Sequence, residues 1–159
     1  VDVLVLAGLY TLRVIGGTLA LGLAFSFWLL AFSIFLFLSL AFVKRFVELK
    51  ALQMSGREAA AGRGYGVDDL ELVRSLGVSA GFAAVVVLAL YINSPEIRAQ
   101  YTHPEWIWLV CPVLLYWIAR TWTVAHRGLM HDDPLVFALA DRVSRLTLLI
   151  AVVIAFAAV

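Results

Sequence analysis

The sequence predicts an all-α fold, a multi-pass transmembrane helical bundle, from its composition and from the length of its apolar stretches. The chain has 159 residues, of which 64% are hydrophobic and only 14% are charged, well outside the range of soluble domains. A helix of about 20 apolar residues crosses the hydrocarbon core of a bilayer. Such stretches predict about five membrane helices, at roughly 2–22, 25–43, 72–92, 106–125 and 134–159.

Local signals define the boundaries of the first three predicted helices. A very short connection that contains Gly22 and Ser26 joins the first two, so we expect a tight antiparallel hairpin. The third helix follows Asp68 and Asp69. Either carboxylate can accept hydrogen bonds from the free N–H groups at the helix start.

The last two predicted helices contain prolines at informative positions. Pro112 lies within the fourth helix, where it removes one backbone hydrogen bond and predicts a kink. Asp133 and Pro134 are typical of the N-cap and the first position of a helix. We therefore expect one continuous helix from residue 134 to 159, because its uninterrupted apolar part alone is too short to cross a bilayer.

Basic residues predict the orientation of the bundle. The connection 44–74 is rich in Lys and Arg, whereas the connection 93–105 has Arg98 as its one Lys or Arg. Because Lys and Arg concentrate in cytoplasmic loops, we expect the first connection, with a loop at about 46–70, to be cytoplasmic. The basic segment 120–145 falls on the same side when five helices alternate. Two polar clusters are therefore expected on one face of the membrane.

The first polar cluster is "FVKRFVELK", which continues the second predicted helix into the cytoplasm. Lys44 and Arg45 precede Glu48 by four and three residues, so the three side chains can converge on a helix. One interpretation is a snorkelling helix end with an intrahelical ion pair. The other is an anion cradle, in which the two cations reach a phosphate while Glu48 holds one of them or meets a metal.

The second polar cluster lies in "LMHDDPLVFALADRVSR". On a continuous helix Asp141 and Arg145 share a face, and Arg142 is turned about 100° away. One interpretation is an amphipathic helix entrance with an Asp141–Arg145 ion pair. The other is a site for Mg²⁺ and a diphosphate, because Mg²⁺ takes hard oxygen ligands and bridges to phosphates. Asp141 would then direct a cation toward phosphate, with three candidates: Arg142, Arg145 and Lys44.

A single charged residue, Arg13, lies well within the first predicted membrane helix. A charge at that depth costs at least ~2.5 kcal/mol unless it faces a partner or a polar cavity. We therefore expect Arg13 to point inward, toward an acidic side chain on another helix or toward a bound anion. The sequence is compatible with both a structural salt bridge and a phosphate contact.

The segments "LYTLR", "KRFVEL" and "DDPLVFALADR" together resemble the C-terminal half of the UbiA superfamily of intramembrane prenyltransferases. They are most similar to the branch that includes decaprenyl-phosphate phosphoribosyltransferase. The resemblance covers essentially the whole chain, residues 1–159, as helices five to nine of a single nine-helix transmembrane domain. The family's second acidic motif usually has two aspartates, whereas the corresponding place here has Glu48 as its one acid. This difference argues against metal binding by this segment and favours phosphate binding by Lys44 and Arg45.

The resemblance implies a Mg²⁺-dependent transferase of the bacterial inner membrane, with its cavity on the cytoplasmic side. A polyprenyl lipid would lie in a lateral groove, and a diphosphate substrate would bind in the cavity. In the phosphoribosyl branch, a lipid phosphate oxygen would attack the anomeric carbon of phosphoribosyl diphosphate, and diphosphate would depart. The implied site residues are catalytic Lys44, Glu48 and Asp141, phosphate-binding Arg13, Arg45, Arg142 and Arg145, and metal-binding Asp133.

The expected partner is the N-terminal half of the same bundle, which would supply the rest of the cavity and the first acidic motif. We therefore expect this chain alone to be inactive, and we expect no nucleic acid partner. An alternative is half of a transporter or channel, in which Arg13 and the acids line a substrate path. A purely structural membrane subunit is a third interpretation. The concentration of charge on one side of the membrane favours the transferase.

Overall fold

A computed structural model describes residues 2–20, 26–56, 66–95, 98, 101, 103–130 and 133–158. The regular elements of these residues are helices, which confirms the predicted all-α class. In chain order they are α1 (Asp2–Ala20), α2 (Phe27–Met54), η1 (Val67–Asp69), α3 (Leu70–Ile92), α5 (Pro104–Ile107), α6 (Val110–His126), α7 (Pro134–Ala140) and α8 (Arg142–Ala157).

Three helical stretches of the described chain are long and apolar enough to cross a membrane. They are Phe27–Met54, Val67–Ile92 and Glu105–His126. The first and last predicted membrane helices correspond to α1, with 19 residues, and α8, with 16 residues. Because about 20 residues cross a hydrocarbon core, α8 is short for a complete span, and the five-helix topology stays a prediction.

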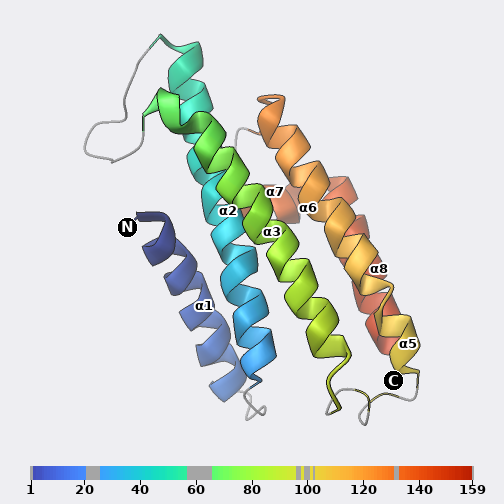
Figure 1. Ribbon diagram of the computed structural model, residues 1–159. Helices are drawn as coiled ribbons and strands as arrows, with labels where there is room; N and C mark the ends of the chain where they lie inside the picture. The colour runs from blue at the N-terminus through green and yellow to red at the C-terminus, as the bar shows by residue number, and fades with distance from the viewer. Residues whose placement is uncertain are drawn as a thin grey trace.

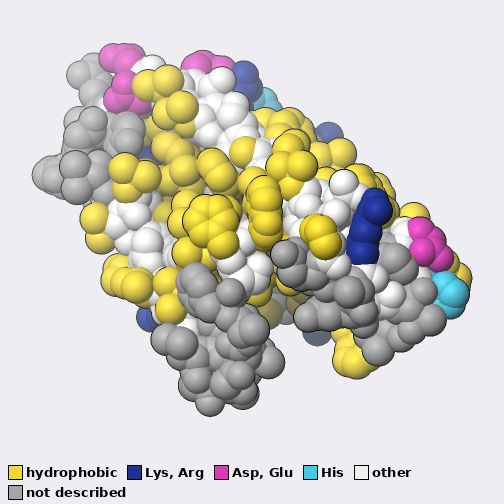
Figure 2. All heavy atoms as spheres, turned by 60° about the horizontal axis from the view of Figure 1, so that its bottom comes forward, with side chains coloured by type: hydrophobic (Ala, Val, Ile, Leu, Met, Phe, Trp, Pro, Cys, Tyr) yellow, Lys and Arg dark blue, Asp and Glu magenta, His cyan; other side chains and the backbone are white. Residues whose placement is uncertain are grey.

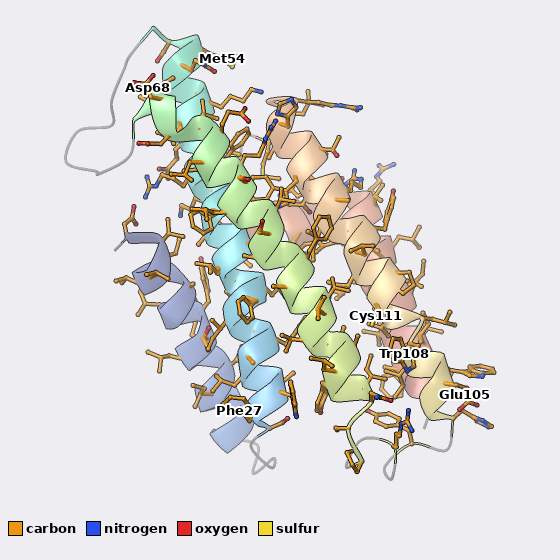
Figure 3. All side chains as sticks on the ribbon, viewed as in Figure 1. Phe27, Met54, Asp68, Glu105, Trp108 and Cys111 are labelled. Carbon is orange, nitrogen blue, oxygen red and sulfur yellow. The ribbon has the colours of Figure 1, made fainter. Side chains whose placement is uncertain are left out.

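The long helices lie side by side and alternate in direction along the chain (Figure 1). In this order α1 packs on α2, α2 on α3, α3 on α6, and α6 on α8, while α7 contacts both α2 and α8. Met54 and Asp68 lie at one end of the bundle, and Phe27 lies at the opposite end (Figure 3). The predicted loop at about 46–70 begins later than expected, because α2 continues as a helix to Met54.

The surface of the described chain is largely hydrophobic. In one view, hydrophobic side chains cover the centre of the molecule, and acidic side chains lie at its margins (Figure 2). The helix α8 exposes a particularly large apolar area through Leu146, Leu148, Leu149, Val153 and Phe156. An apolar exterior is the property that a lipid environment requires of a helix bundle.

One crossing of α2, α3 and α6 is held by Ser39, Gly77 and Trp122, which we call the neutral seam. The Ser39 hydroxyl donates a hydrogen bond to the Gly77 carbonyl oxygen at 2.7 Å, and the Trp122 indole N–H donates to Ser39 Oγ at 3.2 Å. A Cβ atom at position 77 would lie 2.2 Å from Trp122 Cζ2 and 2.6 Å from Phe42 Cβ. Glycine therefore permits the close approach of these helices.

The helix that contains Pro112 is bent near its start, in agreement with the predicted kink. The segment α5 ends at Ile107, two residues in turn conformation follow, and α6 begins at Val110. Pro112 thus lies in the first turn of α6, where a backbone N–H would have no helical acceptor. At the same end of the bundle, the His103 N–H donates a hydrogen bond to the Ala158 carbonyl oxygen at 3.1 Å.

The prediction of one continuous helix from residue 134 is wrong, because the helix breaks at Asp141. This residue has extended backbone angles, φ −71° and ψ 129°, between α7 and α8. Its carboxylate accepts a hydrogen bond from the Ser144 N–H at 2.7 Å and so caps the start of α8. As a result α7 has only 7 residues, and Asp141 and Arg145 do not share the face of one uninterrupted helix.

Candidate functional site

The charged residues of "FVKRFVELK" line a pocket of about 220 Å³ between the start of α1 and the second half of α2. The antiparallel hairpin of α1 and α2 creates this pocket, because it returns the chain to the level of its own beginning (Figure 1). We call it the polar pocket, and its charged lining residues are Asp2, Lys44, Arg45 and Glu48.

Arg45 is the most deeply buried charged residue of the polar pocket, with 7% of its side chain exposed. Its guanidinium donates to the Glu48 carboxylate at 2.5 Å and forms an ion pair with Asp2. Within the described residues, the Arg45 Nε atom is buried and has no hydrogen-bond partner. A buried cation needs such carboxylates to offset the loss of hydration. Arg45 is therefore already neutralised by its two acidic neighbours.

Lys44 lies beside Arg45 but turns toward a different element. Its ammonium donates a hydrogen bond to Asp133 Oδ2 at 2.7 Å, and 39% of the Lys44 side chain is exposed. Asp133 also accepts a hydrogen bond from the Leu135 N–H at 3.1 Å, and Pro134 follows it, as the predicted helix start requires. Lys44 thus joins the polar pocket to the N-terminus of α7.

The protonation of Asp133 follows from these contacts. Partial burial raises the pKa of its carboxyl, but the hydrogen bonds from Lys44 and Leu135, together with the Lys44 charge, outweigh burial and lower the pKa below its usual range. Asp133 is therefore ionised at neutral pH. An ionised Asp133 can hold the Lys44 ammonium in one position at the edge of the polar pocket.

A second interhelical ion pair joins α6 to the break between α7 and α8. Arg120 donates two hydrogen bonds to the Asp141 carboxylate, at 2.7 and 3.2 Å. The Arg120 guanidinium also lies 5.7 Å from the centroid of the Phe137 ring on α7. We call the two pairs, Lys44–Asp133 and Arg120–Asp141, the charged seam. They anchor the two ends of α7.

The structure brings some of the predicted site residues together and separates others. Lys44, Arg45, Glu48 and Asp133 form one connected group at the polar pocket and the charged seam. Asp141 lies at the other end of α7, where it pairs with Arg120 instead of the three cations expected for it.

The three remaining predicted cations lie on exposed surfaces. Arg142 and Arg145 are exposed in the first turn of α8, because the break at Asp141 reorients that turn. Arg13 is exposed on α1, and its guanidinium lies 5.7 Å from the centroid of the Tyr10 ring. The expected inward orientation of Arg13 is not found among the described residues, since α1 is an edge helix that packs on α2.

Two functional candidates, Asp2 and Arg120, are absent from the predicted site. Asp2 is the one acidic residue of α1, and the predicted hairpin carries it to the level of Arg45. Arg120 lies within the fourth predicted membrane helix, where an ionisable residue is by default a functional candidate. The sequence therefore marked both Asp2 and Arg120 as candidates. It did not reveal their ion-pair partners, because these depend on how each helix is rotated about its axis.

The described residues do not fit a resident Mg²⁺ site on their own. They contain no cluster of three or more His, Cys, Asp or Glu side chains. Asp2, Glu48, Asp133 and Asp141 each contact a cation instead. Asp133 in particular pairs with Lys44 and caps α7, so its predicted contact with a metal has no support from this arrangement. His131 and Asp132 lie outside the described residues.

The fold and the site define a module of a helical membrane protein with a charged pocket at one end. The chain is 38% identical over 144 residues to the uncharacterized protein y4nM of Sinorhizobium fredii, and 40% identical over 141 residues to the nodulation protein NoeC of Azorhizobium caulinodans. These alignments cover 90% and 88% of the chain but only 28% and 46% of the two relatives. No known family profile and no solved structure matches the chain.

Proposed function

We propose that the chain forms part of a membrane-embedded transferase that acts on a polyprenyl lipid and a diphosphate substrate. The observation that supports this proposal is the polar pocket, in which Lys44 and the neutralised Arg45 lie at one end of an otherwise apolar bundle. In the proposal five helices cross a bacterial inner membrane, and the charged end faces the cytoplasm. The resemblance to the UbiA superfamily, in its phosphoribosyltransferase branch, supports the same reaction class.

The two cations of the polar pocket have different roles in this proposal. Lys44 contacts the diphosphate, because an exposed ammonium has three N–H donors and Asp133 uses one of them. Arg45 offers a buried Nε–H that has no hydrogen-bond partner in the described residues. Its terminal nitrogens are bound by Asp2 and Glu48. In this proposal the Lys44 ammonium, held in place by Asp133, stabilises the negative charge that develops on a departing diphosphate.

The proposed reaction breaks the bond between the donor carbon and its diphosphate oxygen. The diphosphate leaves with the electron pair, and an oxygen of the lipid acceptor forms the new bond to the same carbon. The Mg²⁺ that the family resemblance implies would need ligands beyond the described residues, so no step of this proposal depends on it. Arg142 and Arg145 are exposed near the break and are available to a phosphate of the lipid.

An apolar groove between α6 and α8 supports the lipid part of the proposal. It has a volume of about 360 Å³ and is lined by Pro112, Val113, Tyr116, Val143, Leu146, Thr147 and Ile150. Such a surface can accept an isoprenoid chain from the side of the bundle. A transporter half would need polar groups along an internal path through the membrane. The stretch of α2 before Lys44 contains no charged side chain, and Arg13, the cation within α1, is exposed in the described chain.

The names of the two relatives contribute little to the reaction class. NoeC is named a nodulation protein, and y4nM is uncharacterized. The similarity suggests that this chain serves a related process, but the name points to no residue or substrate. The proposal therefore depends on the polar pocket and on the resemblance.

The test is a transfer assay with the intact protein in lipid nanodiscs. Purified protein is incubated with polyprenyl phosphate and labelled phosphoribosyl diphosphate, and in a parallel sample with labelled prenyl diphosphate. We expect a labelled product in which the donor group is bound to the polyprenyl acceptor and which chromatography separates from both labelled donors, and we expect the Lys44→Gln variant to form it at least ~10²-fold more slowly. The matched control is Arg74→Gln, which removes an exposed ion pair with Glu71 on α3 and should leave the rate unchanged. Absence of a labelled transfer product, separate from the donor, in both samples would contradict the proposal.

A further inference from the structure

The short helix α7 is held in place by its contacts with neighbouring helices. With 7 residues it is far below the length at which an isolated helix is stable in water. Its N-cap residue, Asp133, is bound by Lys44 of α2. Its C-cap residue, Asp141, is bound by Arg120 of α6. Phe137, between them, packs against the main apolar core. The position of α7 therefore depends on the charged seam.

The two ion pairs of the charged seam differ in geometry. The Lys44–Asp133 pair is a single hydrogen bond, and the Lys44 side chain is 39% exposed. The Arg120–Asp141 pair has two hydrogen bonds between less exposed side chains, at 22% and 20%. A planar guanidinium that binds a carboxylate with two bonds fixes direction as well as distance. The Arg120 end of α7 is thus the more rigid end.

We infer that Arg120 is a positioning residue for the anion site, which acts on Lys44 through Asp141, α7 and Asp133. The inference rests on the proposed function, because it assigns Arg120 a role toward the diphosphate that Lys44 binds. Arg120 is not a ligand of the diphosphate, since its guanidinium already binds Asp141 and packs on Phe137. It fixes the C-terminal end of α7, and α7 holds Asp133, at its N-terminal end, in the place where Asp133 orients the Lys44 ammonium.

The first experiment measures this linkage without any substrate. The intact protein in nanodiscs is treated briefly with an amine-acetylating reagent, and the modification of Lys44 is measured by mass spectrometry relative to Lys50. Lys50 is a suitable internal reference, because its ammonium donates to the His126 carbonyl oxygen on α6 instead of to a carboxylate of the charged seam. We expect Arg120→Gln to increase the relative labelling of Lys44 roughly three-fold or more, because the hydrogen bond to Asp133 is lost.

Further variants keep this experiment decisive if Arg120→Gln folds poorly. Asp141→Asn retains the cap of α8 but removes the charge that Arg120 binds, so it should increase Lys44 labelling in the same way. Arg74→Gln is the control on a remote exposed pair and should have no effect. Unchanged Lys44 labelling in a folded Arg120→Gln or Asp141→Asn variant would overturn the inference.

The second experiment measures the affinity for inorganic diphosphate in a double-mutant cycle. Arg120→Gln should weaken binding about five- to ten-fold in the wild-type background and have no effect in the Lys44→Gln background. Equal effects in both backgrounds would mean that Arg120 acts independently of Lys44, which would overturn the inference alone. If wild-type protein binds no diphosphate, the proposed function fails instead, and the labelling experiment still decides whether Arg120 positions Lys44.

Discussion

The neutral seam and the charged seam both join α2 to α6, but they stabilise the bundle by different means. In the neutral seam, Gly77 lets three helices approach closely, and the hydrogen bonds of Ser39 and Trp122 are short-range and uncharged. In the charged seam, the long side chains of Lys44 and Arg120 bind carboxylates at the two ends of α7. The neutral seam is therefore sensitive to added volume, and the charged seam is sensitive to loss of charge.

The same difference predicts which substitutions should affect stability and which should affect function. The neutral seam is closely packed around Gly77 and has no room for a ligand, and the Ser39 hydroxyl and the Trp122 indole N–H each have a hydrogen-bond partner. The charged seam includes Lys44, which is partly exposed and lines the polar pocket. Substitutions in the neutral seam should therefore change the amount of folded protein, whereas substitutions in the charged seam should change substrate binding and turnover in a folded protein.

The largest effect is expected from added volume at Gly77. A Cβ atom there would overlap Trp122 and Phe42, so Gly77→Leu should prevent normal assembly of α2, α3 and α6. Even Gly77→Ala should destabilise the bundle by about 1–3 kcal/mol, the usual effect of overpacking. The measurement is the melting temperature and the yield of monodisperse protein.

Gly8→Ala is the matched control for this substitution, because a Cβ atom at Gly8 meets nothing within 4 Å in the described chain. It should be neutral or slightly stabilising, since glycine weakens a helix by roughly 0.5–1 kcal/mol relative to alanine. Equal melting temperatures for Gly77→Ala and Gly8→Ala would show that the neutral seam is not a close crossing.

The next largest effect is expected from loss of charge in the charged seam. If the protein is the proposed transferase, Asp141→Asn should lower its turnover at least ~10²-fold, the scale of one well-placed electrostatic contact, while folding is preserved because Asn caps a helix about as well as Asp. Asp133→Asn should lower turnover at least as much, because Asp133 is the direct acceptor of the Lys44 ammonium and the Arg120–Asp141 pair acts on Lys44 through it. The measurement is turnover at saturating substrate, with melting temperatures as the control. Near-normal turnover in both variants would mean that the seam has only a structural role.

The smallest effect is expected from acid. The pKa of Asp133 is lowered in the folded protein, so its ion pair contributes stability above the ordinary carboxyl pKa of about 3.9, and this contribution is lost as the pH falls through the lower folded value. The contribution is at most about 1 kcal/mol, because Lys44 is partly exposed. The difference in melting temperature between wild type and Asp133→Asn should therefore be complete above the ordinary carboxyl pKa of about 3.9 and should shrink as the pH falls below it. A difference that grows as the pH falls below about 4 would contradict the proposed pair.

Much of this arrangement could be predicted from the sequence. Long apolar stretches predicted α2 and α3, the residue spacing predicted the Arg45–Glu48 pair, and Asp133 with Pro134 predicted the start of α7. These are local properties of the chain, so a single sequence contains them. The same-side placement of "KRFVEL" and Asp133 followed from the alternation of helices, and the Lys44–Asp133 hydrogen bond agrees with it.

The remaining features depend on tertiary structure. The segment "FALADRVSR" is compatible with an unbroken helix, and the break at Asp141 arises because its carboxylate both caps α8 and binds Arg120. That pair requires a specific rotation of α6, which apolar composition does not define. For the same reason the sequence did not reveal that Arg13 lies on the exposed side of α1.

The most direct test of the account is a calorimetric titration of inorganic diphosphate into the intact protein in nanodiscs, with two lysine variants of α2. Lys44 lines the polar pocket, whereas Lys50, six residues later, donates to the His126 carbonyl oxygen. We predict that Lys44→Gln weakens binding at least about ten-fold, the effect of one lost charged hydrogen bond, and that Lys50→Gln binds as the wild type does. Equal affinities for wild type and Lys44→Gln, or a loss confined to Lys50→Gln, would contradict the assignment of the polar pocket as a diphosphate site.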